Sequence, residues 1–195
     1  MSILFIDTET TGLPLRNNLT RELSDPKDFQ KYDNARLIEV AYKITSPADK
    51  SFLLTSSTLV KNETLKIENT SIHGISTELA LEQGKNVSEL LDEILDDLNT
   101  YDVQKIVAHN IEFDLNILLA ECYRYNKLEL IQKLSNINEK YCTMKEAQKL
   151  FNFKKFPKLK ELYEYLFQKT FENQHTALSD CNACLKCFNE MMKLK

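Results

Sequence analysis

Residues 1–14 of this chain read MSILFIDTETTGLP. The apolar and β-branched residues at positions 3–6 predict a buried strand, and the T-T-G-L-P that ends the stretch predicts a turn. Residues two apart on a strand share a face, so one face should carry, in order, Ile3, Phe5, Asp7 and Glu9. A buried apolar row therefore runs directly into two neighbouring carboxylates.

Two adjacent anions at the end of a buried strand repel each other and lose hydration. Carboxylate oxygens are the ligands that Mg²⁺ or Mn²⁺ prefers, so Asp7 and Glu9 are candidate metal ligands. The alternative is a strand that ends at the surface with two solvated acids. A metal site therefore requires further acids, placed toward the core, elsewhere in the chain.

The composition is that of an ordinary water-soluble chain. Its 195 residues suit a single domain, 1–195, with a full core. The net charge of -4 argues against non-specific binding of nucleic acid over the whole surface, but leaves room for a local basic groove. We expect no membrane partner, because no apolar run reaches the length of a span. The five cysteines and the absence of a secretion signal favour a reducing, cytoplasmic location.

The order of predicted elements indicates an α/β protein. Residues 37–45 and 51–60 should follow the first strand in an antiparallel meander of three strands. The remaining prediction is a helix at 87–98, a strand at 104–108, a helix from about 110 to 125, a strand at 139–143, and helices at 144–151, 158–167 and 176–192. Residues 15–36 should form an excursion with no role that we can assign, and residues 69–74 a loop. This order favours a mixed five-stranded sheet flanked by helices.

Two more acids lie where acids are costly. Asp114 heads the apolar stripe of its predicted helix, and Asp180 lies on the buried face of the last one. Each alone could be a core-edge carboxylate that accepts a backbone N–H. Together with Asp7 and Glu9, however, they make four carboxylates that crossover topology can bring to one end of the sheet. Such a group is typical of two-metal phosphoryl transfer.

These acids stand in recognisable local motifs, which are D-x-E-T-T-G-L-P from Asp7, H-N-x-x-F-D from His109 to Asp114, and H-x-A-x-x-D from His175 to Asp180. In this order they resemble the DnaQ-like 3′→5′ exonucleases of the DEDD superfamily, in the histidine-bearing DEDDh branch. A-R-L-I-E-V-A at 35–41, S-I-H-G-I at 71–75 and C-T-M at 142–144 also look like family segments. The resemblance covers most of the chain and implies a ribonuclease H-like fold.

The resemblance implies a role for each matching residue. Four carboxylates would hold two Mg²⁺ or Mn²⁺: Asp7, Glu9, Asp114 and Asp180. His175 would be the general base for the attacking water, Thr10 would offer its backbone N–H to the terminal 3′-hydroxyl, and Leu13 would wedge against the last base. The enzyme would then release nucleoside 5′-monophosphates from a single-stranded or frayed 3′ end of DNA or RNA.

Three further residues are candidate substrate contacts. The resemblance puts the loop that carries His73 near the terminal nucleotides, although a plain loop histidine is the alternative. His109 and Asn110 begin the second motif. The alternative for His109 is a supporting role, and Asn110 can cap the helix that follows it.

Some features remain open to more than one interpretation. Lysines and phenylalanines alternate through 151–160, FNFKKFPKLK, which suggests either a solvated turn or an edge that contacts phosphates. Cys181, Cys184 and Cys187 are better explained as small core residues than as zinc ligands. Alternative functions are an endonuclease of the same fold, an aspartyl phosphatase, an inactive nucleic-acid-binding module, and a proofreading subunit bound to a polymerase.

Overall fold

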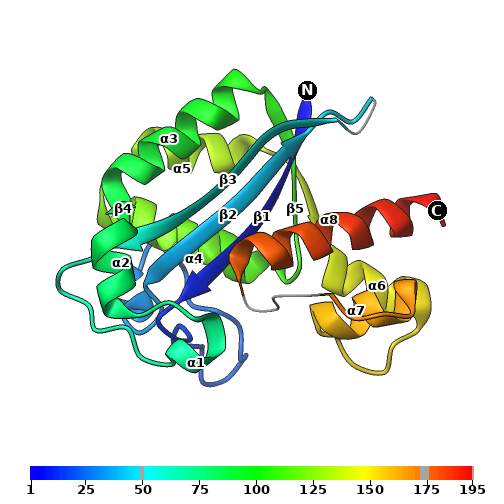
Figure 1. Ribbon diagram of the computed structural model, residues 1–195, viewed down its shortest axis with the longest axis horizontal. Coiled ribbons are helices and arrows are strands. Elements are labelled where there is room, and N and C mark those ends of the chain that lie inside the picture. The colour runs from blue at the N-terminus through cyan, green and yellow to red at the C-terminus, as the bar shows by residue number, and fades with distance from the viewer. Residues whose placement is uncertain (49–50, 172–175, 195) are drawn as a thin grey trace.

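The computed structural model describes residues 1–48, 51–171 and 176–194. A six-stranded mixed sheet forms its centre, in the order β4-β3-β2-β1-β5-β6, with helices on both faces (Figure 1). The strands are β1 (Ser2–Thr10), β2 (Leu37–Thr45), β3 (Phe52–Lys61), β4 (Lys85–Asn86), β5 (Val103–Ala108) and β6 (Glu139–Cys142). The predicted α/β class is confirmed, and all five predicted strands are present. β4 is an addition that no sequence pattern marks, because two residues carry no periodicity.

The described residues form eight α-helices and a short 3₁₀ helix, η1 (Phe29–Tyr32). The α-helices are α1 (Thr70–His73), α2 (Thr77–Gln83), α3 (Val87–Thr100), α4 (Ile111–Arg124), α5 (Leu128–Asn136), α6 (Thr143–Phe151), α7 (Leu159–Phe167) and α8 (Ala177–Lys193). The sequence did not predict α2 or α5. The prediction of a loop at 69–74 was wrong, since one turn of helix forms there between left-handed Asn69 and Gly74.

Successive side chains of β1 point to opposite faces of the sheet, so they pack in two separate layers of the core. Leu4 and Ile6 pack on the face covered by α3, α4 and α5, whereas Phe5 packs on the face covered by α8. Figure 1 shows α8 in front of the sheet and α4 and α5 behind it. The predicted antiparallel meander of β1, β2 and β3 is confirmed, and β5 runs parallel to β1. Because β1 and β5 are parallel, their carboxyl ends meet at the same edge of the sheet.

A buried ion pair fastens α4 to the start of β2. Arg36 donates from Nε and Nη2 to the two carboxylate oxygens of Glu121, at 2.6 and 3.0 Å. The backbone of Arg36 also exchanges hydrogen bonds with Thr11, in the turn after β1. The turn, β2 and α4 therefore hold one another in place, which sets the orientation of the helix that carries Asp114.

The excursion of residues 15–36 packs against the same helix. Arg124, in the last turn of α4, donates to the carbonyl oxygen of Phe29 at 2.9 Å and to Asp33 at 2.6 Å. Its guanidinium also lies over the Phe29 ring. None of the helices in the described part of the chain combines the length and apolar character needed to cross a membrane.

Candidate active site

Three of the four predicted acids come together at the end of β1. Asp7 and Glu9 project from that strand, and Asp180 lies in the first turn of α8, which covers the same face. Each offers a carboxylate oxygen, and these oxygens lie within 4.8 Å of one another. Oxygen donors at this spacing suit a hard divalent cation.

Asp114 reaches the cluster from the opposite layer. Its side chain is only 3% exposed, and its Oδ1 accepts hydrogen bonds from the backbone N–H and the hydroxyl of Thr8, at 3.0 and 2.9 Å. The charge of Asp114 contributes to the raised pKa of Asp7, although Asp114 is not one of the three acids whose oxygens lie within 4.8 Å of one another. The prediction that Asp114 points inward is confirmed.

Burial and mutual repulsion raise the pKa values of Asp7, Glu9 and Asp114. Burial, followed by the charges of the neighbouring acids, raises the pKa of Asp7 well above its usual range and raises that of Glu9 to about 8. Burial also raises the pKa of Asp114, although the two hydrogen bonds from Thr8 oppose the shift. A bound cation would remove the cause of this repulsion, so the four side chains fit a metal site.

A fifth acid, Glu39 on β2, was missed by the sequence analysis. It lies directly opposite Glu9 in the antiparallel register and is buried. Its carboxylate accepts from the hydroxyl of Ser57 at 2.9 Å and from the backbone N–H of Ala177, the first residue of α8, at 3.2 Å. Glu39 thus ties β2 to the helix that carries Asp180. The available signal was an acid inside the apolar run L-I-E-V-A.

A pocket of about 600 Å³ opens beside Glu9. It is lined by residues 8–13 together with Asn69, Ile72, His73 and Phe113. Of the predicted substrate contacts it includes Thr10, Leu13 and His73. Leu13 is 72% exposed, so its side chain is free to touch a ligand.

His73 lines this pocket with a buried ring. It is 5% exposed, and its Nδ1 accepts from the backbone N–H of Ile75 at 3.1 Å. The ring proton therefore lies on Nε2, because Nδ1 acts as an acceptor. This Nε2 is buried, and the backbone of Glu68 acts on the ring.

His109 and Asn110 lie outside that pocket lining. The Nε2 of His109 donates to the carbonyl oxygen of Pro157, and its Nδ1 contacts the hydroxyl of Thr143, both at 3.0 Å. Burial lowers the pKa of His109 to about 4, which keeps the ring neutral. Asn110 lies at the N-cap position of α4, as predicted, but with a left-handed backbone, φ of 71°, and its side chain makes no capping hydrogen bond. His175 lies outside the described residues.

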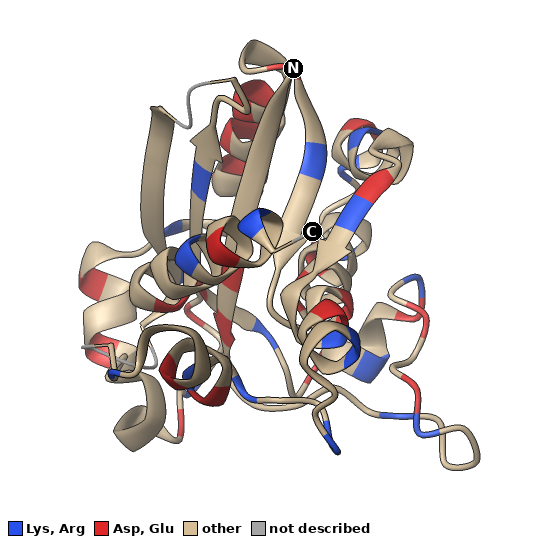
Figure 2. Ribbon diagram, turned by 90° about the vertical axis from the view of Figure 1, so that its right-hand side faces the viewer, with Lys and Arg blue, Asp and Glu red and all other residues tan. Residues whose placement is uncertain are grey.

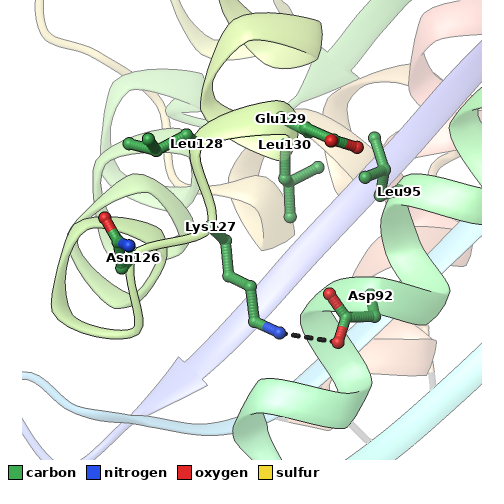
Figure 3. Close-up of a pocket in the computed structure, with 7 residues that line it drawn as sticks. All are labelled: Asp92, Leu95, Asn126, Lys127, Leu128, Glu129 and Leu130. Carbon is green, nitrogen blue, oxygen red and sulfur yellow. Dashed lines mark hydrogen bonds and ion pairs between the residues drawn. The ribbon is translucent and has the colours of Figure 1, made fainter.

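Another hollow, of about 340 Å³, lies between α3 and α5 (Figure 3). Lys127 forms an ion pair with Asp92 across it, at 2.6 Å. None of the four predicted acids lines this hollow. The pocket beside Glu9 is therefore the candidate active site.

Comparison with known proteins identifies the family and the fold. The sequence model of the exonuclease family RNase_T matches residues 4–188. Sequence comparison with curated proteins finds no significant match. Among solved structures, E. coli exonuclease I in complex with a dT13 oligonucleotide superposes with a TM-score of 0.74 at 16% identity, over 98% of this chain. This chain spans only 41% of that protein's chain.

Two smaller structures are similar over most of their own length. The nuclease domain of 3′hExo, described as a DEDDh family member bound to rAMP, gives a TM-score of 0.71 at 15% identity, over 98% of this chain and 92% of that one. Exonuclease X in complex with 5′ overhanging duplex DNA gives 0.59 at 21% identity, with the same coverage. At these identities the likeness establishes the fold, which is ribonuclease H-like.

The raised pKa of Glu9 predicts how metal-free protein responds to pH. Its pKa is about 8 in the folded state and has an ordinary value of 4.5, so folding binds a proton in this interval. The stability that this proton contributes is present below the ordinary pKa and is lost as the pH rises through the folded value. In EDTA, the melting temperature of the wild type should therefore fall between about pH 5 and 8 more steeply than that of Glu9→Gln.

Thermal melts of both proteins across this pH range measure the difference. Adding Mn²⁺ near pH 8 should raise the melting temperature of the wild type more than that of the variant, because Glu9 is a ligand only when ionised. Equal pH slopes for the two proteins would contradict the assignment of a strained, protonated Glu9.

The contact between Glu39 and Ala177 predicts a positioning role. Glu39→Ala removes the acceptor that holds the first turn of α8, so Mn²⁺ affinity should fall by about ten- to a hundred-fold. Amide exchange at residues 177–180 should quicken in the metal-free protein. Glu39→Gln keeps a carbonyl oxygen that can accept from Ala177, so its Mn²⁺ affinity and its amide protection should fall less than those of Glu39→Ala. Ser57→Ala, which removes only the other partner of Glu39, is the matched control. If Glu39→Ala shows the amide exchange rates and the Mn²⁺ affinity of the wild type, Glu39 has no positioning role.

Proposed function

This chain belongs to the RNase_T exonuclease family, and we propose that it hydrolyses phosphodiester bonds from the 3′ end of DNA or RNA and releases nucleoside 5′-monophosphates. The observation that carries the proposal is the convergence of Asp7, Glu9 and Asp180 beside the pocket of residues 8–13. One of the similar structures is described as showing 3′-end specific recognition of a histone mRNA stem-loop by a 3′-exonuclease, which supports the polarity.

The carboxylates Asp7, Glu9, Asp114 and Asp180 would hold two Mg²⁺ or Mn²⁺. When bound, these cations polarise the scissile phosphodiester and its attacking water. The support is the donor set itself, in which burial, followed by repulsion from neighbouring acids, raises the pKa values of Asp7, Glu9 and Asp114. Ionised by the cations, the same groups lose that repulsion and become fixed ligands.

The pocket beside Glu9 would take the 3′-terminal nucleotide. Thr10 would bind the 3′-hydroxyl through its backbone N–H, and the exposed side chain of Leu13 would pack on the last base. His73 would form part of the wall against which this nucleotide packs. Asn110 and His109 would support this site by placing the start of α4. His175 would accept the proton of the attacking water, since a near-neutral imidazole suits that task.

The cellular setting proposed is a reducing, cytoplasmic compartment. All five cysteines are free and buried, and none forms a disulfide. Cys181 and Cys184 pack in the core beneath α8, as small apolar residues would. This supports thiols that serve packing and are kept reduced.

End-labelled substrates test the reaction and its direction. With Mg²⁺, a 3′-labelled oligonucleotide should release labelled mononucleotide from the first turnover, and a 5′-labelled one should give a ladder that shortens stepwise. EDTA and Asp180→Asn should both abolish turnover. A 3′-phosphate should slow hydrolysis strongly, because Thr10 would lose its hydroxyl partner. DNA and RNA versions identify the sugar that is accepted. Internal fragments, or equal rates on blocked and free ends, would indicate an endonuclease instead.

The two polar residues of the third motif should behave differently. His175→Ala removes a proton acceptor and leaves every carboxylate, so kcat should fall by about a hundred- to ten-thousand-fold while Mn²⁺ binding persists. The acid limb of its pH–rate profile, near about pH 6.5, should disappear. Asp180→Asn should lose Mn²⁺ affinity and turnover together. If His175→Ala stays within a few-fold of wild type and keeps the acid limb, His175 is not the base.

A further inference from the structure

The basic loop, defined here as residues 152–158 between α6 and α7, reads NFKKFPK and contains three lysines and no acid. The chain as a whole has a net charge of -4. Figure 2 shows acidic and basic residues interspersed along the elements in view. The basic loop is therefore an unusual local concentration of positive charge.

Strand register and one hydrogen bond place this loop beside the acids. Phe5 pairs with Val107 across β1 and β5, and Asp7 and His109 each follow two residues beyond that pair. Neighbouring strands lie about 4.8 Å apart. His109 donates to the carbonyl oxygen of Pro157, which belongs to the loop. The loop is therefore separated from Asp7 by about the spacing of two neighbouring strands plus the length of the His109 side chain.

The base of the loop is held firmly by packing. The Phe153 ring packs against Phe151 of α6 and Tyr165 of α7, with centroids 6.2 and 5.2 Å away. The other ring nitrogen of His109 contacts Thr143, at the start of α6. The loop is thus fastened to both helices and to the end of β5.

Outside these anchors the side chains of the loop are exposed. Phe156 is 50% exposed. Lys155 forms an ion pair with Glu161 at 3.0 Å, and the charge of Lys158 also acts on Glu161. Lys154 and Lys158 are exposed and form no ion pair within residues 1–48, 51–171 and 176–194. The loop therefore presents two exposed lysines and one accessible ring.

We infer that the basic loop binds single-stranded nucleic acid on the 5′ side of the scissile phosphodiester, with Lys154 and Lys158 on backbone phosphates and Phe156 stacked on a base. Free cations along a backbone path and an exposed ring for stacking are the features that bind single strands. The inference rests on the proposed function, which puts the 3′ end of the strand in the pocket beside Glu9.

The two ends of the substrate would then lie on opposite sides of β1. The pocket for the terminal nucleotide includes α1, which follows β3 on the β2 side of β1. The basic loop is fastened to β5, on the other side. Figure 1 shows α1 and α7 well apart at this end of the sheet. A strand that enters over the loop would cross the acids before its 3′ end reaches the pocket.

Binding without hydrolysis tests this inference. We would titrate a fluorescent DNA strand of about twelve nucleotides in EDTA and measure Kd over a range of salt. Lys154→Ala/Lys158→Ala should bind more weakly, and its plot of log affinity against log salt should be shallower by about 1.4. Phe156→Ala should bind about five- to a hundred-fold more weakly. The loss should be greater for the long strand than for a dinucleotide, which cannot reach the loop.

The control is Lys133→Ala/Lys193→Ala, which removes the same charge from α5 and from the far end of α8. It should keep the wild-type salt slope. Melting temperatures show whether any variant is misfolded. Equal Kd and slope in the loop variant and this control would overturn the inference. The inference would also be overturned if the loop variant bound the oligonucleotide normally but no longer bound polyglutamate. The loop would then bind an acidic protein. Because binding needs no turnover, failure of the exonuclease assay is a separate result.

Discussion

Repulsion between half-buried carboxylates is the constraint on which the candidate active site depends. Asp7 and Glu9 share one face of β1, and Asp180 brings a third carboxylate to the same place. In water such groups would separate and hydrate. Here the strand and helix α8 prevent separation, and burial prevents full hydration. The charge must be neutralised by protons or cations, which is why we propose that cations bind at this end of the sheet.

The rest of the fold resists that repulsion through contacts outside the cluster. Thr8 holds Asp114 with two hydrogen bonds, and Glu39 holds the first turn of α8. Arg36 and Glu121 fasten α4 to β2 through a buried pair, whose disruption would leave an uncompensated charge. The geometry of the site is therefore a property of the elements around it, since no single acid has reason to stay near the others.

His109 connects the site to the surface beyond it. Its neutral ring is shared between Thr143 at the start of α6 and Pro157 before α7. Burial lowers the pKa of His109 to about 4, so its ring is neutral with the proton on Nε2, which donates to Pro157. His109 therefore links the end of β5 to α6 and to the basic loop by two short contacts.

The sequence by itself determined everything that depends on local periodicity. Period-two alternation put Asp7 and Glu9 in one row after Phe5, and helical periodicity turned Asp114 and Asp180 toward the core. The short elements β4 and α2 escaped notice because they contain too few residues to show a clear period. Helix α5 is as long as α6 and α7, so its apolar pattern was present in the sequence and was overlooked.

Only the tertiary structure decided which distant segments meet. Glu39 bonds to a backbone amide 138 residues away, and His109 to a carbonyl 48 residues away. The left-handed backbone of Asn110 is likewise set by how β5 leads into α4. No local pattern encodes these contacts, because each depends on strand register and helix packing established by the whole core.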